Sequence, residues 1–326
     1  MWLLFKLLVT TVLVGVIVWQ LGGVTDVIGV MGRMHPEYIA LVLLVNTADR
    51  ALMTFKWIQL LRSRGMDLPF LHAMRIYCAS MVWGTFLPAT AGADVVRAFS
   101  TSRIGLDPNV VVSSIIIERM VGFLSALLLG LISLVLLSLS GSLDPRLRVT
   151  WFVGMLLLIG ATSVFALSFN KRAFEWLETR LLYPWRENRL MQRFRHFYGI
   201  YRGYQDDKKI LVVFFALTMG EQLLPILHSW LIAWGLGIEV SLLYVAGAVP
   251  LSILISRIPV SIDGLGIFEG TFILLMSLAG VSAPEAVAIA FMGRILQTAS
   301  WLPWWLAHVL QTKEFRVPRT AQAVRR

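Results

Sequence analysis

Several charged side chains interrupt the most apolar stretches of this chain. Glu118 and Arg119 lie well inside the aliphatic stretch 109–139. An ionised group in a hydrocarbon environment costs about 2.5 kcal/mol or more, so it is normally paired, turned toward the interior of a helix bundle, or functional. Neighbours in sequence point about 100° apart on a helix, so we expect Glu118 and Arg119 to need partners from other segments.

Candidate partners occur where Pro and Gly residues interrupt apolar sequence. Asp94 and Arg97 follow the first interruption, and Asp263 and Glu269 belong to the second. Arginine offers parallel donors to a phosphate, and the N-terminus of a helix favours an anion. The functional interpretation is an anion site in which the arginines contact a phosphate or headgroup and the carboxylates orient them. The arginines are Arg97, Arg119 and Arg294, and the carboxylates are Asp94, Glu118, Asp263 and Glu269.

Structural roles for the same side chains are open alternatives. For Asp94 the alternative is an N-cap on the short helix that follows, with Arg97 at the membrane interface. For Arg119 and Arg294 the alternative is a buried structural ion pair. The carboxylates available for such pairs are Glu118, Asp263 and Glu269.

Composition places these charges in a membrane protein. The chain of 326 residues is 57% hydrophobic and 15% charged, and its mean hydropathy of +0.75 exceeds what the surface of a soluble domain allows. The net charge of +10 reflects basic loops, as membrane topology requires, and not a nucleic-acid partner. Cys78 and five scattered histidines offer no ligand spacing, so we expect no metal and no other cofactor.

Hydrophobic length predicts an all-α, polytopic helical bundle. A helix needs about 20 apolar residues to cross the hydrocarbon core. The stretch 3–21 is interpreted as a retained first helix, because no small-x-small cleavage site follows it. Two shorter apolar stretches, 73–87 and 242–258, each precede a break containing Pro and Gly, so we expect broken or re-entrant segments there. The six predicted full spans are 3–21, 39–61, 109–139, 149–168, 210–234 and 284–310.

Loop charges predict the orientation, because cytoplasmic loops are enriched in Lys and Arg. The segments 62–75, 169–209 and 311–326 are basic, so they and both termini are placed in the cytoplasm. The segments 22–38 and 235–241 are poor in Lys and Arg and are placed outside. The loop 141–148 stays ambiguous. We expect a multi-pass protein of a bacterial inner membrane.

The two breaks lie in stretches that resemble each other. Each contains a Pro, a small-polar-Gly break and a carboxylate at the start of a new helix, and Arg119 and Arg294 occupy corresponding positions in the apolar helices that follow. The charge argument puts the first break inside and the second outside, so the units 39–139 and 210–310 are predicted to be inverted. Inverted repeats with broken helices are typical of secondary transporters. Irregular backbone at membrane depth needs protein or a water-filled cavity around it, so the breaks predict a cavity.

The long basic loop has a helical period. Aromatic and aliphatic residues recur at spacings of three and four between arginines in 186–208, which predicts an amphipathic helix. The sequence is equally compatible with two placements of this helix. The helix contacts an anionic leaflet, or it packs beneath the bundle with its basic face in water.

Three motifs resemble those of a known family. They are residues 87–98 (LPATAGADVVRA), 116–119 (IIER) and 258–270 (IPVSIDGLGIFEG). They are similar to the motifs of the lysylphosphatidylglycerol synthase transmembrane-region family, also called flippase-like membrane proteins, and they span most of the chain. The resemblance implies a lipid-translocating module. The predicted substrate-binding residues are Pro88, Gly92, Asp94, Arg97, Glu118, Arg119, Pro259, Asp263, Gly264, Gly266, Glu269 and Arg294.

Three positions depart from the pattern of that family. Ala93 and Asp263 stand where Gly is usual, and Phe268 stands where Arg usually precedes Glu269. The loss of that Arg weakens the transfer of the family's headgroup contacts to the second break. The longest segment outside the membrane is the 169–209 loop, so synthase activity is not expected.

These features favour a flippase-like transporter that moves a phospholipid, or a polyprenyl- or glycolipid-linked anionic headgroup, across the membrane. No Gly-x-x-x-x-Gly-Lys-Ser/Thr loop occurs, so transport is expected to be passive or driven by an ion gradient. One alternative is a non-catalytic partner of an envelope lipid or glycolipid enzyme, with a homo-oligomer also open. The other is an intramembrane lipid-phosphate transferase using the same carboxylates as acid and base. The charged clusters contain no His and no nucleophile motif, so we expect no enzyme.

Overall fold

The computed structural model describes residues 24–85, 92–139, 148–180, 189–257 and 264–310, together with Thr11, Gly15 and Ser261. All regular structure in these residues is helical, which confirms the predicted all-α class. The predicted span 3–21 lies almost wholly outside the described residues, as do the loop 141–148 and the tail 311–326.

Among the described residues, three helical stretches are long and apolar enough to cross a membrane, namely Pro36–Arg62, Pro108–Ser138 and Lys208–Gly235. Shorter apolar helices cover Phe152–Ser168, Leu242–Ser256 and Ile267–Leu278. All of these stretches except Ile267–Leu278, which follows the second break, coincide with predicted spans or with the second predicted broken segment, which supports a helical membrane bundle. The helices up to the long loop are α2 (Val24–Met31), α3 (Pro36–Arg62), α4 (Phe70–Thr85), α5 (Gly92–Arg103), α6 (Pro108–Leu139) and α7 (Arg148–Ser168). The later elements are α8 (Lys171–Arg180), α9 (Arg189–Arg202), the 3₁₀ turn η3 (Gly203–Gln205), α10 (Lys208–Glu221), α11 (Leu224–Gly235), α12 (Leu242–Ser256), α13 (Ile267–Leu278) and α14 (Ala283–Val309).

The helices recur in the same order in the two halves of the chain. The series α3, α4, α5 and α6 is followed later by α10–α11, α12, α13 and α14. Helices α3 and α10 begin at Pro36 and Lys208, and the starts of α4 and α12 are separated by the same offset. Beyond the breaks the offset between the two series is slightly larger. It separates the starts of α6 and α14, at Pro108 and Ala283, and it also separates the starts of α5 and α13. Two constant offsets therefore pair the positions of the two series.

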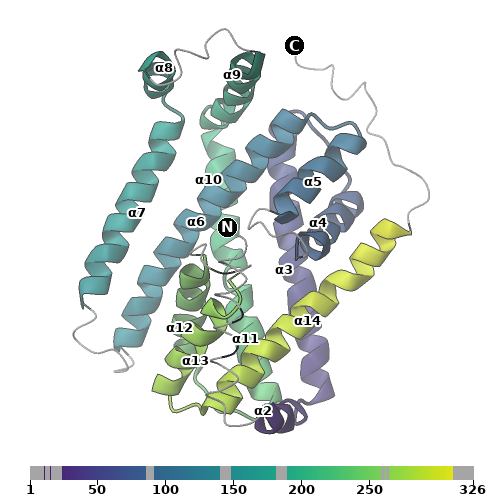
Figure 1. The fold of residues 1–326 in the computed structure, drawn as a ribbon, viewed down its shortest axis with the longest axis vertical. Coiled ribbons are helices and arrows are strands. Elements are labelled where there is room, and N and C mark those ends of the chain that lie inside the picture. The colour runs from purple at the N-terminus through teal and green to yellow at the C-terminus, as the bar shows by residue number, and fades with distance from the viewer. Residues whose placement is uncertain are drawn as a thin grey trace.

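The two series run in opposite directions through the bundle. In Figure 1, α6 descends from α5 toward the level of α12, whereas α14 rises from the end near α13 and α2. Helices α4 and α5 occupy the upper half of that view, and α12 and α13 occupy the lower half. This is the inverted arrangement predicted for the fold, with one broken helix pair toward each end of the bundle.

Helices from the two series interlock. Helix α4 packs on α14, α12 packs on α6, and α3 packs on both α10 and α11. The second helix of each series therefore covers the last helix of the other. A buried apolar core joins α2, α3, α11, α12, α13 and α14, so the two halves share a hydrophobic core. A second buried cluster joins α3, α4 and α6 within the first half.

The basic loop forms helices α8 and α9, and several of their aromatic side chains pack within the protein, whereas Trp176 and Phe194 are exposed. Phe174 stacks on Tyr198 with ring centroids 3.8 Å apart, and Phe169 stacks on Tyr201 at 5.0 Å. The fully buried Tyr204 donates a hydrogen bond to the carbonyl of Leu60 at 3.1 Å. The part of the aromatic face that includes Tyr201 and Tyr204 is thus used within the protein, while contact of 186–208 with an anionic leaflet stays a prediction.

The close approach of α4 to α5 gives a first testable prediction. A Cβ on Gly84 would lie 2.5 Å from the backbone nitrogen of Ala93, and backbone cannot move aside as a side chain can. Gly84→Ala should therefore lower the free energy of unfolding by about 1–3 kcal/mol, measured by SDS titration of the detergent-solubilised protein. Gly122, which has nothing within 4 Å of its Cβ position, provides the control. Equal stability of Gly84→Ala and Gly122→Ala would contradict this packing.

Candidate functional site

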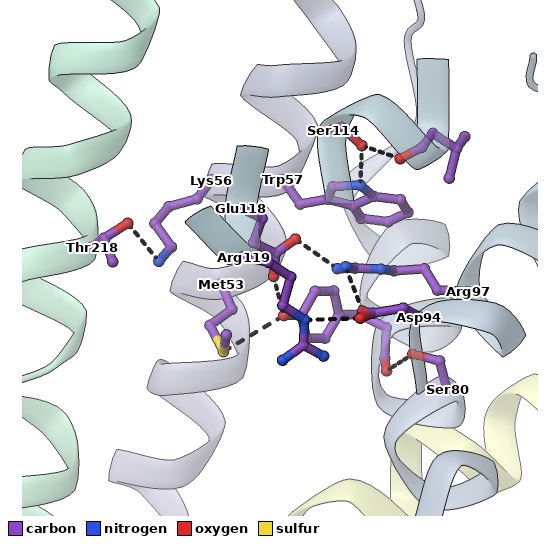
Figure 2. A network of polar contacts seen from close by, with 12 residues as sticks. Met53, Lys56, Trp57, Ser80, Asp94, Arg97, Ser114, Glu118, Arg119 and Thr218 are labelled. Carbon is purple, nitrogen blue, oxygen red and sulfur yellow. Dashed lines mark hydrogen bonds and ion pairs between the residues drawn. The ribbon is translucent and has the colours of Figure 1, made fainter. Parts of the chain in front are cut away.

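Four charged side chains meet beside the first break. Asp94 lies in the first turn of α5, and Arg97 follows one turn later, while Glu118 and Arg119 project from α6. Figure 2 shows the four side chains together. The partners of Glu118 and Arg119 therefore come from another helix.

Arg97 is held entirely within the protein. Its side chain is 2% exposed and lies 2.9 Å from a Glu118 carboxylate oxygen and 3.2 Å from an Asp94 oxygen. The guanidinium carbon also lies 5.0 Å from the ring centroid of Trp57 and 4.7 Å from that of Tyr77. Two carboxylates and two aromatic faces compensate the burial of this cation.

Trp57 and Tyr77 complete this network, although neither was predicted as a site residue. The Tyr77 hydroxyl donates to Glu118 at 2.7 Å, and the Trp57 indole donates to the Ser114 hydroxyl at 3.1 Å. Both aromatic side chains are almost fully buried. They fix the Glu118 carboxylate and the guanidinium of Arg97 in place.

Arg119 faces the opposite way. Its Nε donates to Asp94 at 2.8 Å, but its side chain is 57% exposed. In Figure 2 the two terminal nitrogens of its guanidinium point away from the carboxylate of Asp94. Within the network, Arg119 is thus the arginine that can offer donors to a ligand.

The second break contains a matching ion pair. The Nε and Nη2 atoms of Arg294 donate to one oxygen of Glu269 at 3.0 and 2.7 Å. The other Glu269 oxygen accepts the backbone N–H of Gly266 at 2.7 Å, which closes the start of α13. Gly264 and Gly266 have φ angles of 70° and 81°, a region that favours glycine.

The two ion pairs occupy equivalent positions. Asp94 and Arg119 stand 25 residues apart, and so do Glu269 and Arg294. In both series the carboxylate lies in the first turn of the short helix and the arginine lies in the last long helix. The structure therefore brings the predicted residues together as two separate clusters, one at each break.

The remaining predicted residues have different outcomes. Gly92 is buried and begins α5. Pro88, Pro259 and Asp263 lie outside the described residues, so their predicted roles are not examined by this structure. Among the described residues, no ion pair joins the first cluster to the second.

A third polar layer lies where α3 meets α10 and α11. The Lys56 ammonium contacts Glu221 at 2.5 Å and Thr218 at 3.1 Å. On the same interface, His228 Nδ1 lies 2.7 Å from the side-chain oxygen of Asn46. These contacts were not predicted, because the partners are far apart in sequence and the offset that relates Arg119 to Arg294 does not pair them.

A cavity of about 220 Å³ adjoins the second break. Its lining combines apolar residues, chiefly of α12, α13 and α14, with the polar side chains of His228, Ser256, Arg294 and Gln297. The described residues contain no group of His, Cys, Asp and Glu able to hold a metal ion. Arg294 brings a positive charge to the lining of the cavity.

Sequence comparison places this architecture among known proteins. Residues 3–304 match the lysylphosphatidylglycerol synthase TM region family. The chain belongs to this family. That result confirms the resemblance carried by the three motifs, and with the apolar helices it identifies a multi-pass membrane protein.

Two relatives from Methanothermobacter thermautotrophicus cover most of the chain, and both are described as UPF0104 membrane proteins. One is 23% identical over 279 residues, which cover 81% of this chain and 82% of the relative. The other is 23% identical over 309 residues, which cover 86% of each. The similarity extends across both series of helices.

The Lys56–Glu221 pair gives a second prediction. Both side chains are nearly buried, at 3% and 12% exposed, and removing one partner leaves an uncompensated charge. Lys56→Met should lower the free energy of unfolding by about 3–5 kcal/mol, and Lys56→Met with Glu221→Met should recover much of that loss. SDS titrations of the single and double variants measure both values. A double variant no more stable than Lys56→Met would contradict the ion pair.

Proposed function

We propose that this protein moves an anionic phospholipid or a lipid-linked anionic headgroup across the membrane. The observation that carries the proposal is the pair of equivalent, ion-paired helix breaks, Asp94 with Arg119 and Glu269 with Arg294, in helix series of opposite direction. Broken helices in inverted repeats give alternating access to one central site. The interlocked helices provide packed interfaces along which one series can shift against the other.

Charges near the breaks support an anionic substrate. Arg257 at the C-terminal end of α12 is exposed, and so is Arg119 on α6. No acidic side chain among the described residues forms an ion pair with Arg257. Both arginines can therefore attract an anionic headgroup.

The same geometry argues against catalysis by these carboxylates. A general acid or base must exchange a proton with its substrate. Asp94, Glu118 and Glu269 each contact an arginine, so their carboxylates are already engaged by groups of the protein itself. We therefore propose a transporter without enzyme activity.

Lipid flipping by the pure protein tests this proposal. Proteoliposomes should move fluorescent anionic phospholipids, or polyprenyl phosphate lipids, faster than empty vesicles do. Arg119→Ala should slow this movement by roughly ten-fold or more, the worth of a charge-assisted hydrogen bond. Arg172→Ala, at an exposed position of α8, is the matched control. Equal rates for Arg119→Ala and Arg172→Ala would remove Arg119 from the site, and no flipping of any of these lipids would end the proposal.

The alternative function, a non-catalytic partner that docks through its basic helix, needs a test that disturbs the fold less than deletion of 186–208 would. Deletion would remove Tyr201 and Tyr204, which are buried in the bundle. Arg193→Gln with Arg195→Gln, both at exposed positions of α9, changes the charge and leaves the aromatic packing in place. A self-contained transporter should keep its flip rate in proteoliposomes within roughly two-fold of the native protein, since exposed surface charges contribute little. Loss of flipping in the pure protein, with unchanged unfolding, would instead favour the charged helix as a functional element.

A further inference from the structure

The two helix series enclose equivalent spaces that are filled differently. Each space lies among the first, second, short and last helices of its series, that is α3, α4, α5 and α6, or α11, α12, α13 and α14. The offset from Pro36 to Lys208 pairs positions before the breaks, and the offset from Pro108 to Ala283 pairs positions beyond them. Side chains at paired positions can therefore be compared directly.

Four buried or nearly buried side chains fill the first space. Trp57, Tyr77, Arg97 and Glu118 form a continuous network of aromatic faces, a hydroxyl, a guanidinium and a carboxylate. The positions paired with them in the second space, in the same order, are Ser229, Val249, Phe272 and Gly293. All four of these residues line the 220 Å³ cavity.

The cavity follows from these exchanges. Ser229 replaces an indole, Val249 replaces a phenol ring, and Gly293 removes a carboxylate side chain altogether. Phe272 keeps the bulk of Arg97 but brings no charge. The chain thus closes the first space with its own side chains and leaves the second space open, with room for about seven water molecules.

Gly293 also sets the chemistry of the open space. A Cβ at this position would lie 2.8 Å from Nε2 of His228, so only glycine leaves that edge of the imidazole uncovered. The side-chain oxygen of Asn46 is an acceptor, so Nδ1 of His228 carries the hydrogen in their 2.7 Å bond. Nε2 of the neutral ring is then an acceptor, and it faces a cavity that Arg294 also lines.

We propose that this cavity holds the hydroxylated phosphate headgroup of a lipid. In this complex the Arg294 guanidinium faces the phosphate, and Nε2 of His228 accepts a hydrogen bond from the headgroup hydroxyl. The apolar residues of the lining contact the carbon atoms that join the phosphate to the hydroxyl. The volume admits a headgroup but not acyl chains. That the ligand is a lipid rests on the proposed function. The assignment adds that the second half of the molecule, α11 to α14, is the half that binds it.

Rebuilding the first network in the second space tests the proposal. In Phe272→Arg with Gly293→Glu, the new side chains occupy the positions paired with Arg97 and Glu118. Native mass spectrometry of the detergent-solubilised full chain measures binding of phosphatidylglycerol and phosphatidylethanolamine. The native protein should prefer phosphatidylglycerol by roughly ten-fold, and the double variant should lose this preference. Gly122→Ala, at an open position of α6, should keep it.

Further measurements keep the test decisive if the double variant unfolds. Gly293→Ala adds one methyl group that displaces His228, so it should weaken phosphatidylglycerol binding while the unfolding transition persists. A phosphatidylglycerol preference that survives in folded Gly293→Ala or in the folded double variant overturns the cavity as the site. Displacement of phosphatidylglycerol by an equal concentration of soluble glycerol phosphate overturns the lipid assignment. Binding is measured without transport, so a native protein that binds phosphatidylglycerol but flips no lipid contradicts the proposed function alone.

Discussion

Neutralisation of charge at the two helix breaks is the constraint on which this fold depends. A break in a membrane helix exposes backbone N–H and C=O groups, and they must be satisfied without bulk water. Glu269 meets both needs at the second break, because one oxygen accepts the N–H of Gly266 and the other binds Arg294. Asp94 and Arg119 form the equivalent pair at the first break. The long helix that follows each break supplies the cation, so break and helix form one unit.

The interlocking of the two series turns these local pairs into a single bundle. Since α4 packs on α14 and α12 packs on α6, each break lies beside a long helix of the other series. Each break and the long helix of the opposite half therefore share a packed interface. The polar layer between α3 and α10–α11 joins the halves by Lys56, Thr218 and Glu221.

Most of the fold, but only part of the site, could be predicted from the sequence. Apolar length located the long helices within a few residues, and the correspondence of Arg119 with Arg294 revealed the repeat. Arg97 was predicted to contact a headgroup, whereas in the structure it is enclosed by carboxylates and aromatic rings. Trp57 and Tyr77 could not be inferred, because an aromatic residue in an apolar helix looks like any core residue. The contacts of His228 needed the second, shorter offset between the series, which becomes evident only when the helix starts are known.

That second offset also relates the residues of the polar layer between α3 and α10–α11 to one another. Lys56 and His228 occupy paired positions, as do their hydrogen-bond partners Thr218 and Asn46. Lys56 is bound by Glu221, and on α3 it directly precedes Trp57, which fills the first space. His228 can accept a hydrogen bond through a neutral ring, and it lines the space that remains open. The ion pair therefore accompanies the closed half, and the group able to accept a hydrogen bond accompanies the cavity.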